Sequence, residues 1–337
     1  MVKYTIKDIA RETGFSISTI SRVLNNKKEG VSIESRKKIM EVVEAMNYQP
    51  NQFARGLITK KSNMLGLIVP NILNPFFPEI CRGIEDKASQ LGYSLIICNS
   101  DDQPKKEENY LKLLKEKQVD GILLASLNDL TKQNEDYLLT SQIPYILVDR
   151  DNEHHAPAGV YFDNFKGGFL AGQHLIEQGH KRIACMTGPP NILSSKRRLK
   201  GFLAAMEEFR VPVAESHILA GNYHMEEAYS LAKSFLQKNE VTAIFTSNDL
   251  MACGVYQAAY ELGISIPKDL SVIGFDNISF GEILNPKLST IRQDTYEMGA
   301  ESVNLIVQKI QNETAQSAFF EPTLVLRDST AKVKEKE

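Results

Sequence analysis

The chain has 337 residues and a formal net charge of −3, with 42% hydrophobic and 24% charged residues. This balance is typical of a globular protein of two or three domains, and it excludes a disordered chain. The four cysteines lack CxxC spacing, which argues against a disulfide framework or a zinc site. The first residues lack the apolar run of a signal peptide, so we expect a cytoplasmic protein.

Charge is unevenly distributed along the chain. Residues 1–61 hold twelve Lys and Arg against six Asp and Glu, a net charge of +6. The remaining residues hold 27 against 36, a net charge of −9. A small basic head on a larger acidic body indicates that the head meets a polyanion. On charge alone, a solvated surface without a ligand is the alternative.

Three short helices are predicted within the basic head. Thr5, with Asp8 three residues later, is a weak form of the capping box, and Gly14 ends the first apolar pattern. Ser16 can cap a second helix, and a third follows from Glu34 to Met46. Two short helices joined by a glycine turn have the spacing of a helix-turn-helix. Outside the apolar stripe of the second helix lie Ile17, Ser18, Thr19, Ser21 and Arg22.

Those outward side chains suit nucleic acid. Small hydroxyls can contact phosphates, and an exposed arginine can read guanine through two hydrogen bonds. The competing interpretation is a structural three-helix cap without a ligand.

After Ser62 the sequence alternates between short apolar runs and amphipathic helical stretches. The runs are 65–69, 94–98, 121–125, 145–148, 182–186, 243–246 and 271–274, and helical stretches between them include 80–91, 106–117 and 167–178. Nearly all-apolar strands alternating with helices predict doubly wound parallel sheets covered on both faces. A span of about 270 residues suits two such sheets rather than one.

Ligands in such folds bind outside the carboxyl ends of the strands. The polar and aromatic residues that follow the runs are Asn74, Phe76, Phe77, Asp149, Arg150, Arg198, Asn222, Tyr223, Asn248, Asp249, Phe275, Asp276 and Gln293. Carboxylate, amide and guanidinium groups beside aromatic rings suit a polyol ligand. Each residue also has a structural interpretation, because Asp or Asn after a strand often caps a helix and Phe often belongs to the core.

Motifs for enzyme chemistry are missing from the sequence. The six histidines show no metal-ligand spacing, and there is no G-x-S-x-G, G-x-G-x-x-G or P-loop motif. We therefore expect neither catalysis nor a metal or cofactor. The pair Gly167–Gly168 is interpreted as a point of close helix packing rather than a phosphate site.

The stretch from Thr5 to Asn25, together with Asn47–Asn51, closely resembles the headpiece of the lactose-repressor (LacI/GalR) family. The resemblance implies that Ile17, Ser18 and Arg22 lie in the major groove of operator DNA. Residues 51–57 match the family's hinge helix, whose leucine, here Leu57, enters the minor groove. A buried linker leucine is the alternative. Further DNA contacts implied by the resemblance are Thr5, Ser16, Thr19, Ser21, Asn25, Tyr48, Asn51 and Ala54.

The resemblance continues to about residue 330 and narrows to the ribose operon repressors and the related periplasmic ribose-binding proteins. It implies that Phe76, Phe77 and Phe275 sandwich a sugar ring. It also implies a set of residues that bind the sugar hydroxyls: Asn74, Asp149, Arg150, Arg198, Asn248, Asp276 and Gln293. Tyr223 is a weaker match at a position where an aromatic residue is expected.

This family organisation implies a headpiece at 1–50, a hinge helix and linker at 51–61, and an effector-binding and dimerisation core at 62–337. The core divides into an N-subdomain, about 62–161 and 292–322, and a C-subdomain, about 162–291 and 323–332. We expect a homodimeric repressor of a ribose uptake and utilisation operon, released from operator DNA by D-ribose. The last residues lack an apolar heptad, which favours a dimer over a tetramer.

Several alternatives stay open. A catabolite-control-type regulator, with a phosphorylated carrier protein as corepressor, needs arginines on the helix after Gln293, and residues 301–305 contain none. A solute-binding protein is opposed by the basic head, and a sugar-processing enzyme by the missing catalytic motifs. Ribose 5-phosphate or another pentose could be the effector, and the effector could induce or corepress.

Overall fold

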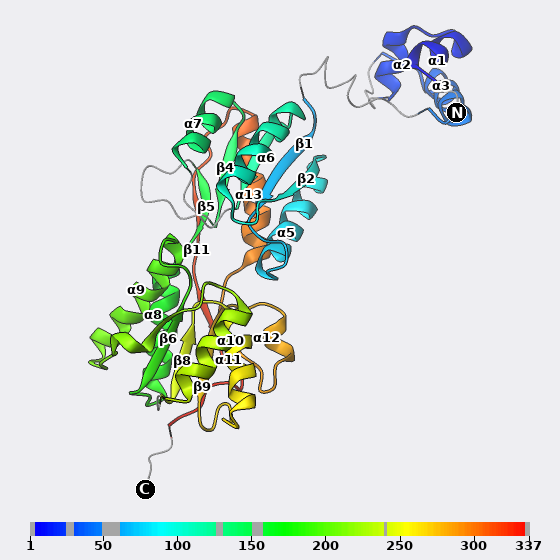
Figure 1. Cartoon of the computed structure of the whole chain (residues 1–337). Helices are drawn as coiled ribbons and strands as arrows, with labels where there is room; N and C mark the ends of the chain where they lie inside the picture. Colours follow the sequence, from blue (N-terminus) through cyan, green and yellow to red (C-terminus); the bar gives the residue numbers. More distant parts are fainter. Residues whose placement is uncertain are drawn as a thin grey trace. The chain divides into compact units, whose positions relative to one another are not determined.

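The computed structural model describes residues 4–24, 30–48, 61–125, 131–149, 158–238 and 241–333. The chain forms two compact units, Met1–Ser62 and Asn63–Glu337 (Figure 1). In the described part of the chain, none of the helices has the length and apolar character needed to cross a bilayer.

The first unit is a three-helix headpiece. Its helices are α1 (Ile6–Thr13), α2 (Ile17–Leu24) and α3 (Ile33–Ala45). The backbone N–H and the hydroxyl of Thr5 both donate to the carboxylate of Asp8, at 2.8 and 2.7 Å, and α1 ends at Gly14 with φ +72°. The predicted capping box and glycine turn are therefore confirmed. The helices enclose a small apolar core of Ile9, Ile20, Val23, Ile39 and Val43.

The second unit contains two six-stranded sheets. The first has the order β11-β5-β4-β3-β1-β2 with every pairing parallel, and the second has the order β12-β10-β9-β8-β6-β7 with only β12 antiparallel. Strands of the first sheet are β1 (Met64–Val69), β2 (Ser94–Asn99), β3 (Gly121–Leu124), β4 (Tyr145–Val148), β5 (Gly159–Phe162) and β11 (Ala318–Phe320). Strands of the second are β6 (Ile183–Thr187), β7 (Ile218–Ala220), β8 (Ala243–Thr246), β9 (Ser271–Asp276), β10 (Ser289–Arg292) and β12 (Thr323–Val325).

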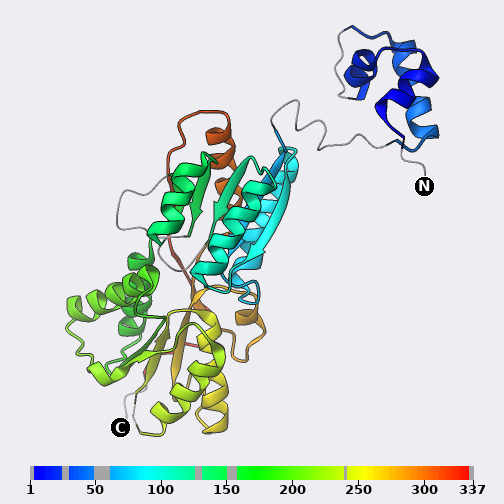
Figure 2. The ribbon, with the colours of Figure 1, turned by 45° about the horizontal axis from the view of Figure 1, so that its top comes forward.

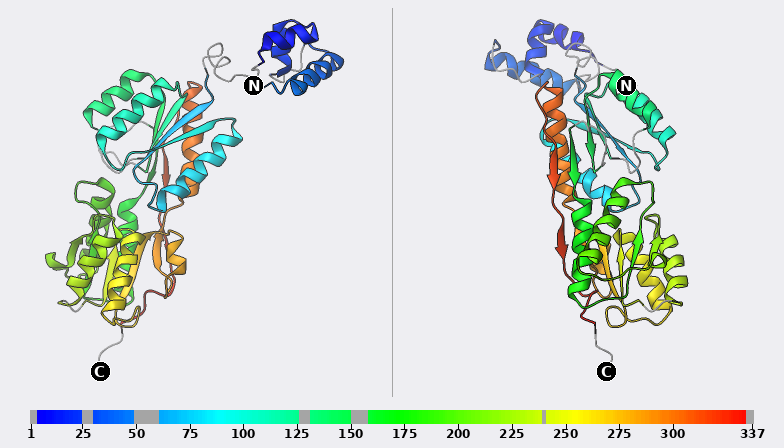
Figure 3. Two further views of the ribbon diagram at one scale, coloured as in Figure 1. Left: turned by 45° about the vertical axis from the view of Figure 1, so that its right-hand side comes forward. Right: turned by 90° about the vertical axis from the view of Figure 1, so that its left-hand side faces the viewer.

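Helices cover both faces of each sheet (Figures 2 and 3). Around the first sheet lie α5 (Phe76–Gln90), α6 (Pro104–Glu116), α7 (Lys132–Ser141) and α13 (Thr295–Ile310). Around the second lie α8 (Asn164–Glu177), α9 (Leu193–Glu208), α10 (Met225–Leu236), α11 (Asp249–Glu261), α12 (Phe280–Ile283) and the 3₁₀ turn η1 (Glu215–His217). This arrangement confirms the predicted fold class, a helix-turn-helix head followed by a two-sheet parallel α/β core.

Small residues set the distance between α8 and α9. A Cβ atom on Gly168 would lie 2.0 Å from the backbone oxygen of Arg198, and one on Gly201 would lie 1.9 Å from that of Phe165. Only glycine permits such a close approach. The interpretation of Gly168 as a packing residue is confirmed, and this contact places Arg198 at the edge of the second sheet.

The chain passes between the two sheets three times, after β5, after β10 and between β11 and β12. After the third passage, the final described segment runs along the second sheet. Ser329 joins two strands there, because its hydroxyl donates to the Val272 carbonyl at 2.6 Å and accepts from the Ser289 N–H at 2.7 Å.

Candidate functional site

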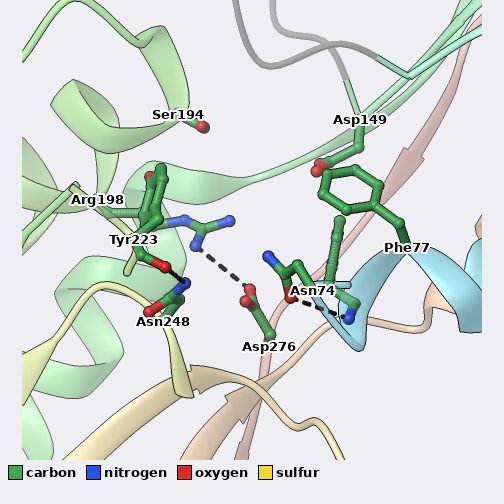
Figure 4. A pocket seen from close by; sticks show the side chains of 9 residues that line it. Asn74, Phe77, Asp149, Ser194, Arg198, Tyr223, Asn248 and Asp276 are labelled. Carbon is green, nitrogen blue, oxygen red and sulfur yellow. Dashed lines mark hydrogen bonds and ion pairs between the residues drawn. The ribbon is translucent and has the colours of Figure 1, made fainter. Parts of the chain in front are cut away.

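A cavity that opens to solvent is formed by residues that follow strands of both sheets (Figure 4). Asp149 follows β4, Asn248 follows β8, and Asp276 ends β9. The lining residues are Asn74, Phe76, Phe77, Asp149, Ser194, Arg198, Tyr223, Asn248 and Asp276. Eight of the eleven residues predicted for the effector therefore lie around one cavity.

Arg198 is the most constrained cation of the site, with only 4% of its surface exposed. Its Nε donates to Asn164 Oδ1 at 2.7 Å, and its Nη1 donates to the Ser247 carbonyl at 2.6 Å. Nη1 also lies 3.3 Å from Asp276 Oδ1. Figure 4 shows the other terminal nitrogen directed into the space between Arg198 and Phe77. The guanidinium group is thus fixed in orientation and keeps one edge available to a ligand.

Asp276 is the acceptor that Arg198 faces. Gln293 Nε2 donates to the same oxygen of Asp276 at 2.8 Å, so two donors converge on one buried carboxylate. Burial raises the pKa of Asp276 to about 6, while the charge of Arg198 and the hydrogen bond from Gln293 oppose that rise. At neutral pH the carboxylate is ionised and can accept hydrogen bonds from a ligand hydroxyl.

Gln293 and Phe275 form a layer behind the lining residues. Gln293 is 2% exposed, and its Oε1 is buried without a hydrogen-bond partner among the described residues. Phe275 is fully buried, with the guanidinium carbon of Arg198 only 3.8 Å from the centre of its ring. Phe275 is not among the lining residues, and the expectation that it packs on a sugar ring stays a prediction. Its ring face is covered by the arginine, as a cation–π contact favours.

The aromatic walls of the cavity come from both sheets. Phe76 and Phe77, at the start of α5, meet edge to face with their ring centres 5.0 Å apart. Tyr223, after β7, lies on the other side, and its ring centre is 5.9 Å from the guanidinium carbon of Arg198. The Tyr223 hydroxyl is buried without a hydrogen bond of acceptable geometry among the described residues, and burial raises its pKa. A bound ligand can satisfy such a group.

Asn248 and Asn74 line the cavity, and each also forms hydrogen bonds with backbone groups. Asn248 Oδ1 caps α11 by accepting from the Met251 N–H at 2.9 Å, and its Nδ2 donates to the Tyr223 carbonyl at 3.3 Å. Asn74 Oδ1 accepts from the Phe76 N–H at 3.1 Å. The two interpretations of these residues, helix entry and ligand contact, are therefore compatible in the structure.

Ser194 lines the cavity and was not singled out in the sequence. It stands four residues before Arg198 on α9, so both side chains lie on the same face of the helix. This helical spacing is the sequence signal that could have identified Ser194. Arg150 lies outside the described residues.

The headpiece presents an exposed surface along α2. Ile17, Ser18 and Arg22 are exposed, with Ile17 at 45%, whereas Thr19 and Ser21 are half-buried. The Ser16 hydroxyl accepts from the Thr19 N–H at 3.2 Å, which confirms Ser16 as the helix cap.

Two further predicted contacts lie beside α2 rather than on it. Thr5 is exposed at the start of α1, and Tyr48 is half-buried against the headpiece core. The remaining residues predicted for DNA lie outside the described residues: Asn25, Asn51, Ala54 and Leu57.

Comparison with known proteins identifies the family. Residues 62–326 match the family model described as periplasmic binding proteins and sugar binding domain of LacI family. Residues 5–51 match the model described as bacterial regulatory proteins, lacI family. The chain belongs to the LacI family. It is therefore a LacI-family transcriptional repressor with a sugar-binding domain, and its relatives are regulators rather than enzymes.

Full-length LacI-family relatives share more than a third of the sequence. The transcriptional regulator DegA of Bacillus subtilis is 39% identical over 335 residues, which cover 98% of this chain and 99% of DegA. A ribose operon repressor of Halalkalibacterium halodurans is 38% identical over 329 residues, 97% of each chain.

Solved LacI-family structures share the architecture. The lac repressor dimer bound to operator and an anti-inducer has a TM-score of 0.89 at 25% identity, covering 98% of this chain and all of that one. A LacI-family regulator of Enterococcus faecium with bound ribose has a TM-score of 0.73 at 31% identity, covering 80% of this chain and all of that one.

Proposed function

We propose that this chain is a homodimeric repressor of a ribose uptake and utilisation operon, with D-ribose as the effector that releases it from operator DNA. The observation that carries the proposal is the cavity in which Arg198 and Gln293 converge on the buried carboxylate of Asp276. A sugar offers several hydroxyl groups, each able to donate and to accept. It also has C–H faces that pack against aromatic rings.

The chemistry of the lining favours an uncharged polyol. Arg198 already carries its counter-charge in Asp276, at 3.3 Å, so the buried pair brings no net charge to the site. A ligand phosphate would have to compete with this carboxylate for the guanidinium group. The full set of donors, acceptors and rings discriminates between hydroxyl patterns, because each missing hydroxyl leaves a buried polar group unpaired.

The choice of D-ribose is supported by two relatives. One is the Halalkalibacterium halodurans ribose operon repressor, and the other is the Enterococcus faecium regulator solved with ribose. A catabolite-control-type regulator is less well supported, because α13, the helix after Gln293, contains no arginine to receive a phosphorylated partner.

DNA binding is assigned to the exposed face of α2, with Ile17, Ser18 and Arg22 as the base-reading residues. The lac repressor dimer on its operator supports this assignment and a two-fold arrangement on near-palindromic DNA. D-ribose would shift the repressor from its DNA-bound state to its released state only if it binds the released state more tightly.

Calorimetric titration of the full-length protein tests the effector. D-ribose is compared with ribose 5-phosphate, other pentoses, glucose and a purine base. We expect saturable binding of D-ribose alone, and much weaker but measurable binding in Asp276→Asn, which keeps the side-chain shape and removes the charge. Arg22→Ala is the matched control, because it lies in the headpiece and should bind D-ribose normally. Binding of another sugar alone would replace the effector, and binding of none would overturn the sugar-responsive function.

A further inference from the structure

The backbone after β9 is strained where it delivers Asp276 to the cavity. Asp276 has φ +108° and Asn277 has φ +62°, two consecutive non-glycine residues with positive φ. Such conformations carry an energetic cost and persist only where the surroundings impose them. The position of the Asp276 carboxylate therefore depends on what holds this turn.

Contacts from within the second sheet hold the turn on its buried side. The Ile278 N–H donates to Asp249 Oδ2 at 2.8 Å, and Asp249 Oδ1 accepts from the Thr290 hydroxyl at 2.7 Å. Asp249 is fully buried, so this acceptor is fixed by the first turn of α11. These contacts fix Ile278 but leave the side chain of Asn277 to be held from elsewhere.

Arg327 holds Asn277 from the outer side. Its Nη2 donates to Asn277 Oδ1 at 2.7 Å, and its Nη1 donates to the Leu288 carbonyl at 2.8 Å. The side chain is only 13% exposed and also lies 3.2 Å from Glu282, whose side chain is 65% exposed. The Arg327 N–H donates to the Ser289 hydroxyl at 3.0 Å, so its backbone is tied to β10 as well.

We propose that Arg327 is a positioning residue for the effector site, which clamps Asn277 and thereby keeps the Asp276 carboxylate between Arg198 and Gln293. Arg327 does not line the cavity. It lies two residues after β12, on the segment that follows the third passage between the sheets. The inference rests on the proposed function, in which Asp276 binds the sugar.

Hydrogen exchange measured by mass spectrometry on the full chain tests the clamp without any ligand. Arg327→Met keeps the length and apolar stem of the side chain but removes its donors. We expect faster exchange in peptides covering residues 276–284 and unchanged exchange in β6 and β8. The matched control is Glu282→Gln, which loses only the exposed ion pair and should exchange like the wild type.

Affinity for D-ribose tests the consequence for the site. We expect Arg327→Met to bind D-ribose roughly tenfold or more weakly, Arg327→Lys to recover part of the loss, and Glu282→Gln to bind normally. In an Asp276→Asn background, Arg327→Met should cause no further loss, because both changes act through one carboxylate. A merely structural role for Arg327 would weaken binding equally in both backgrounds.

Asn277→Gly provides a second variant if Arg327→Met does not fold. It tolerates positive φ, removes the acceptor and leaves the Arg327 bond to Leu288 intact, so it should weaken D-ribose binding similarly. Unchanged exchange at 276–284 in Arg327→Met, or an affinity loss that persists without Asp276, would overturn the clamp. If the wild type does not bind D-ribose, the proposed function fails, and the exchange experiment alone decides the clamp.

Discussion

Asp276 is the carboxylate whose ionisation we expect to limit ligand binding at low pH. Its carboxylate is buried, and burial raises its pKa to about 6 despite the favourable charge of Arg198. The nearby Asp249 carboxyl has a pKa that is also raised by burial and by the charge of Asp276. The ionised form of Asp276 is stabilised by the charge of Arg198 and by the hydrogen bond from Gln293, which both lower its pKa.

Affinity for D-ribose should fall as the pH is lowered through 6. The ionised carboxylate accepts ligand hydroxyls better than the protonated form, so binding draws on the fraction that is ionised. Below the pKa that fraction decreases about tenfold per pH unit, and the affinity should follow. Calorimetric titrations at pH 8, 7, 6 and 5 would measure this change.

Asp276→Asn provides the control for this dependence. The variant should bind D-ribose weakly at every pH in the same series, because position 276 then carries no titrating group. A wild-type affinity that is constant from pH 8 to pH 5 would show that the ionisation of Asp276 does not contribute to binding.

Sequence reasoning identified most lining residues because they follow strands. Asp149, Asn248 and Asp276 stand at carboxyl ends of strands, and parallel strands bring those ends to one edge. The orientation of Phe275 was not predictable in this way. Its ring is covered by a guanidinium group from α9, and such a contact depends on packing between distant elements. Ser194 was missed because it stands on a helix rather than after a strand.

Helix α2 has one face that packs in the headpiece core and another that is exposed to solvent. Ile20 and Val23 are buried in the headpiece core, while Arg22 is exposed between them in sequence. The side chain of Arg22 lies close to Gly30, where an added Cβ would be 3.1 Å from its Nη1. Removal of the Arg22 side chain therefore changes the exposed surface without opening the core.

Arg22→Ala should weaken binding to operator DNA and reduce discrimination against other sequences. An arginine that reads a base contributes about 1–3 kcal/mol of discrimination, which corresponds to roughly 5- to 150-fold in affinity. Selection from random-sequence DNA with the wild type would first define the operator. Fluorescence anisotropy with that operator and with a scrambled duplex would then measure both affinities.

Arg11→Ala is a control with the same loss of charge. Arg11 lies on α1, its side chain is 83% exposed, and it pairs only loosely with Asp8, at 3.7 Å. It should alter binding to operator and scrambled DNA by a similar small factor. Equal loss of both affinities in Arg22→Ala would indicate a phosphate contact rather than base readout.

The apolar strands were predictable because burial on both faces leaves uninterrupted hydrophobic runs. All seven predicted runs correspond to observed strands, within a few residues at their ends. Sequence reasoning missed β5, which is buried throughout but only four residues long, and four strands that carry weaker signals. β7, β11 and β12 have three residues each, lie at sheet edges and are only partly buried, whereas β10 is largely polar in sequence, Ser-Thr-Ile-Arg. Short edge strands do not show a period long enough to detect.

At the scale of the whole molecule, two parallel sheets followed from the length and the alternation of elements. The distribution of strands between the sheets did not follow from these features, and only the family resemblance placed a change of subdomain after residue 322. β11 ends at Phe320 and joins the first sheet, whereas β12 begins at Thr323 and joins the second. Propensity describes each segment alone, while this division depends on which sheet edge is free to accept a strand.

One side of the core exposes apolar residues that suit a dimer interface. Ile97 on β2 is 48% exposed, and Phe280 and Ile283 on α12 are 45% and 78% exposed. β2 and α12 lie on the same side of the core in Figure 1, together with α5. Exposed apolar side chains such as these suit an association surface, and a second copy of the chain is the partner that a two-fold operator requires.

Ile283→Lys should convert the dimer to a monomer and thereby weaken operator binding. A charge buried at the centre of an interface without a partner is strongly unfavourable. A monomer can contact only one half-site, so the affinity for the full operator should fall by about a hundredfold or more. Analytical ultracentrifugation and fluorescence anisotropy would measure the two effects, and retained D-ribose binding would show that the core is folded.

Leu139→Lys is the matched control, because Leu139 on α7 is 64% exposed and lies away from β2 and α12. A dimer that persists in Ile283→Lys but dissociates in Leu139→Lys would place the interface on the opposite side of the core.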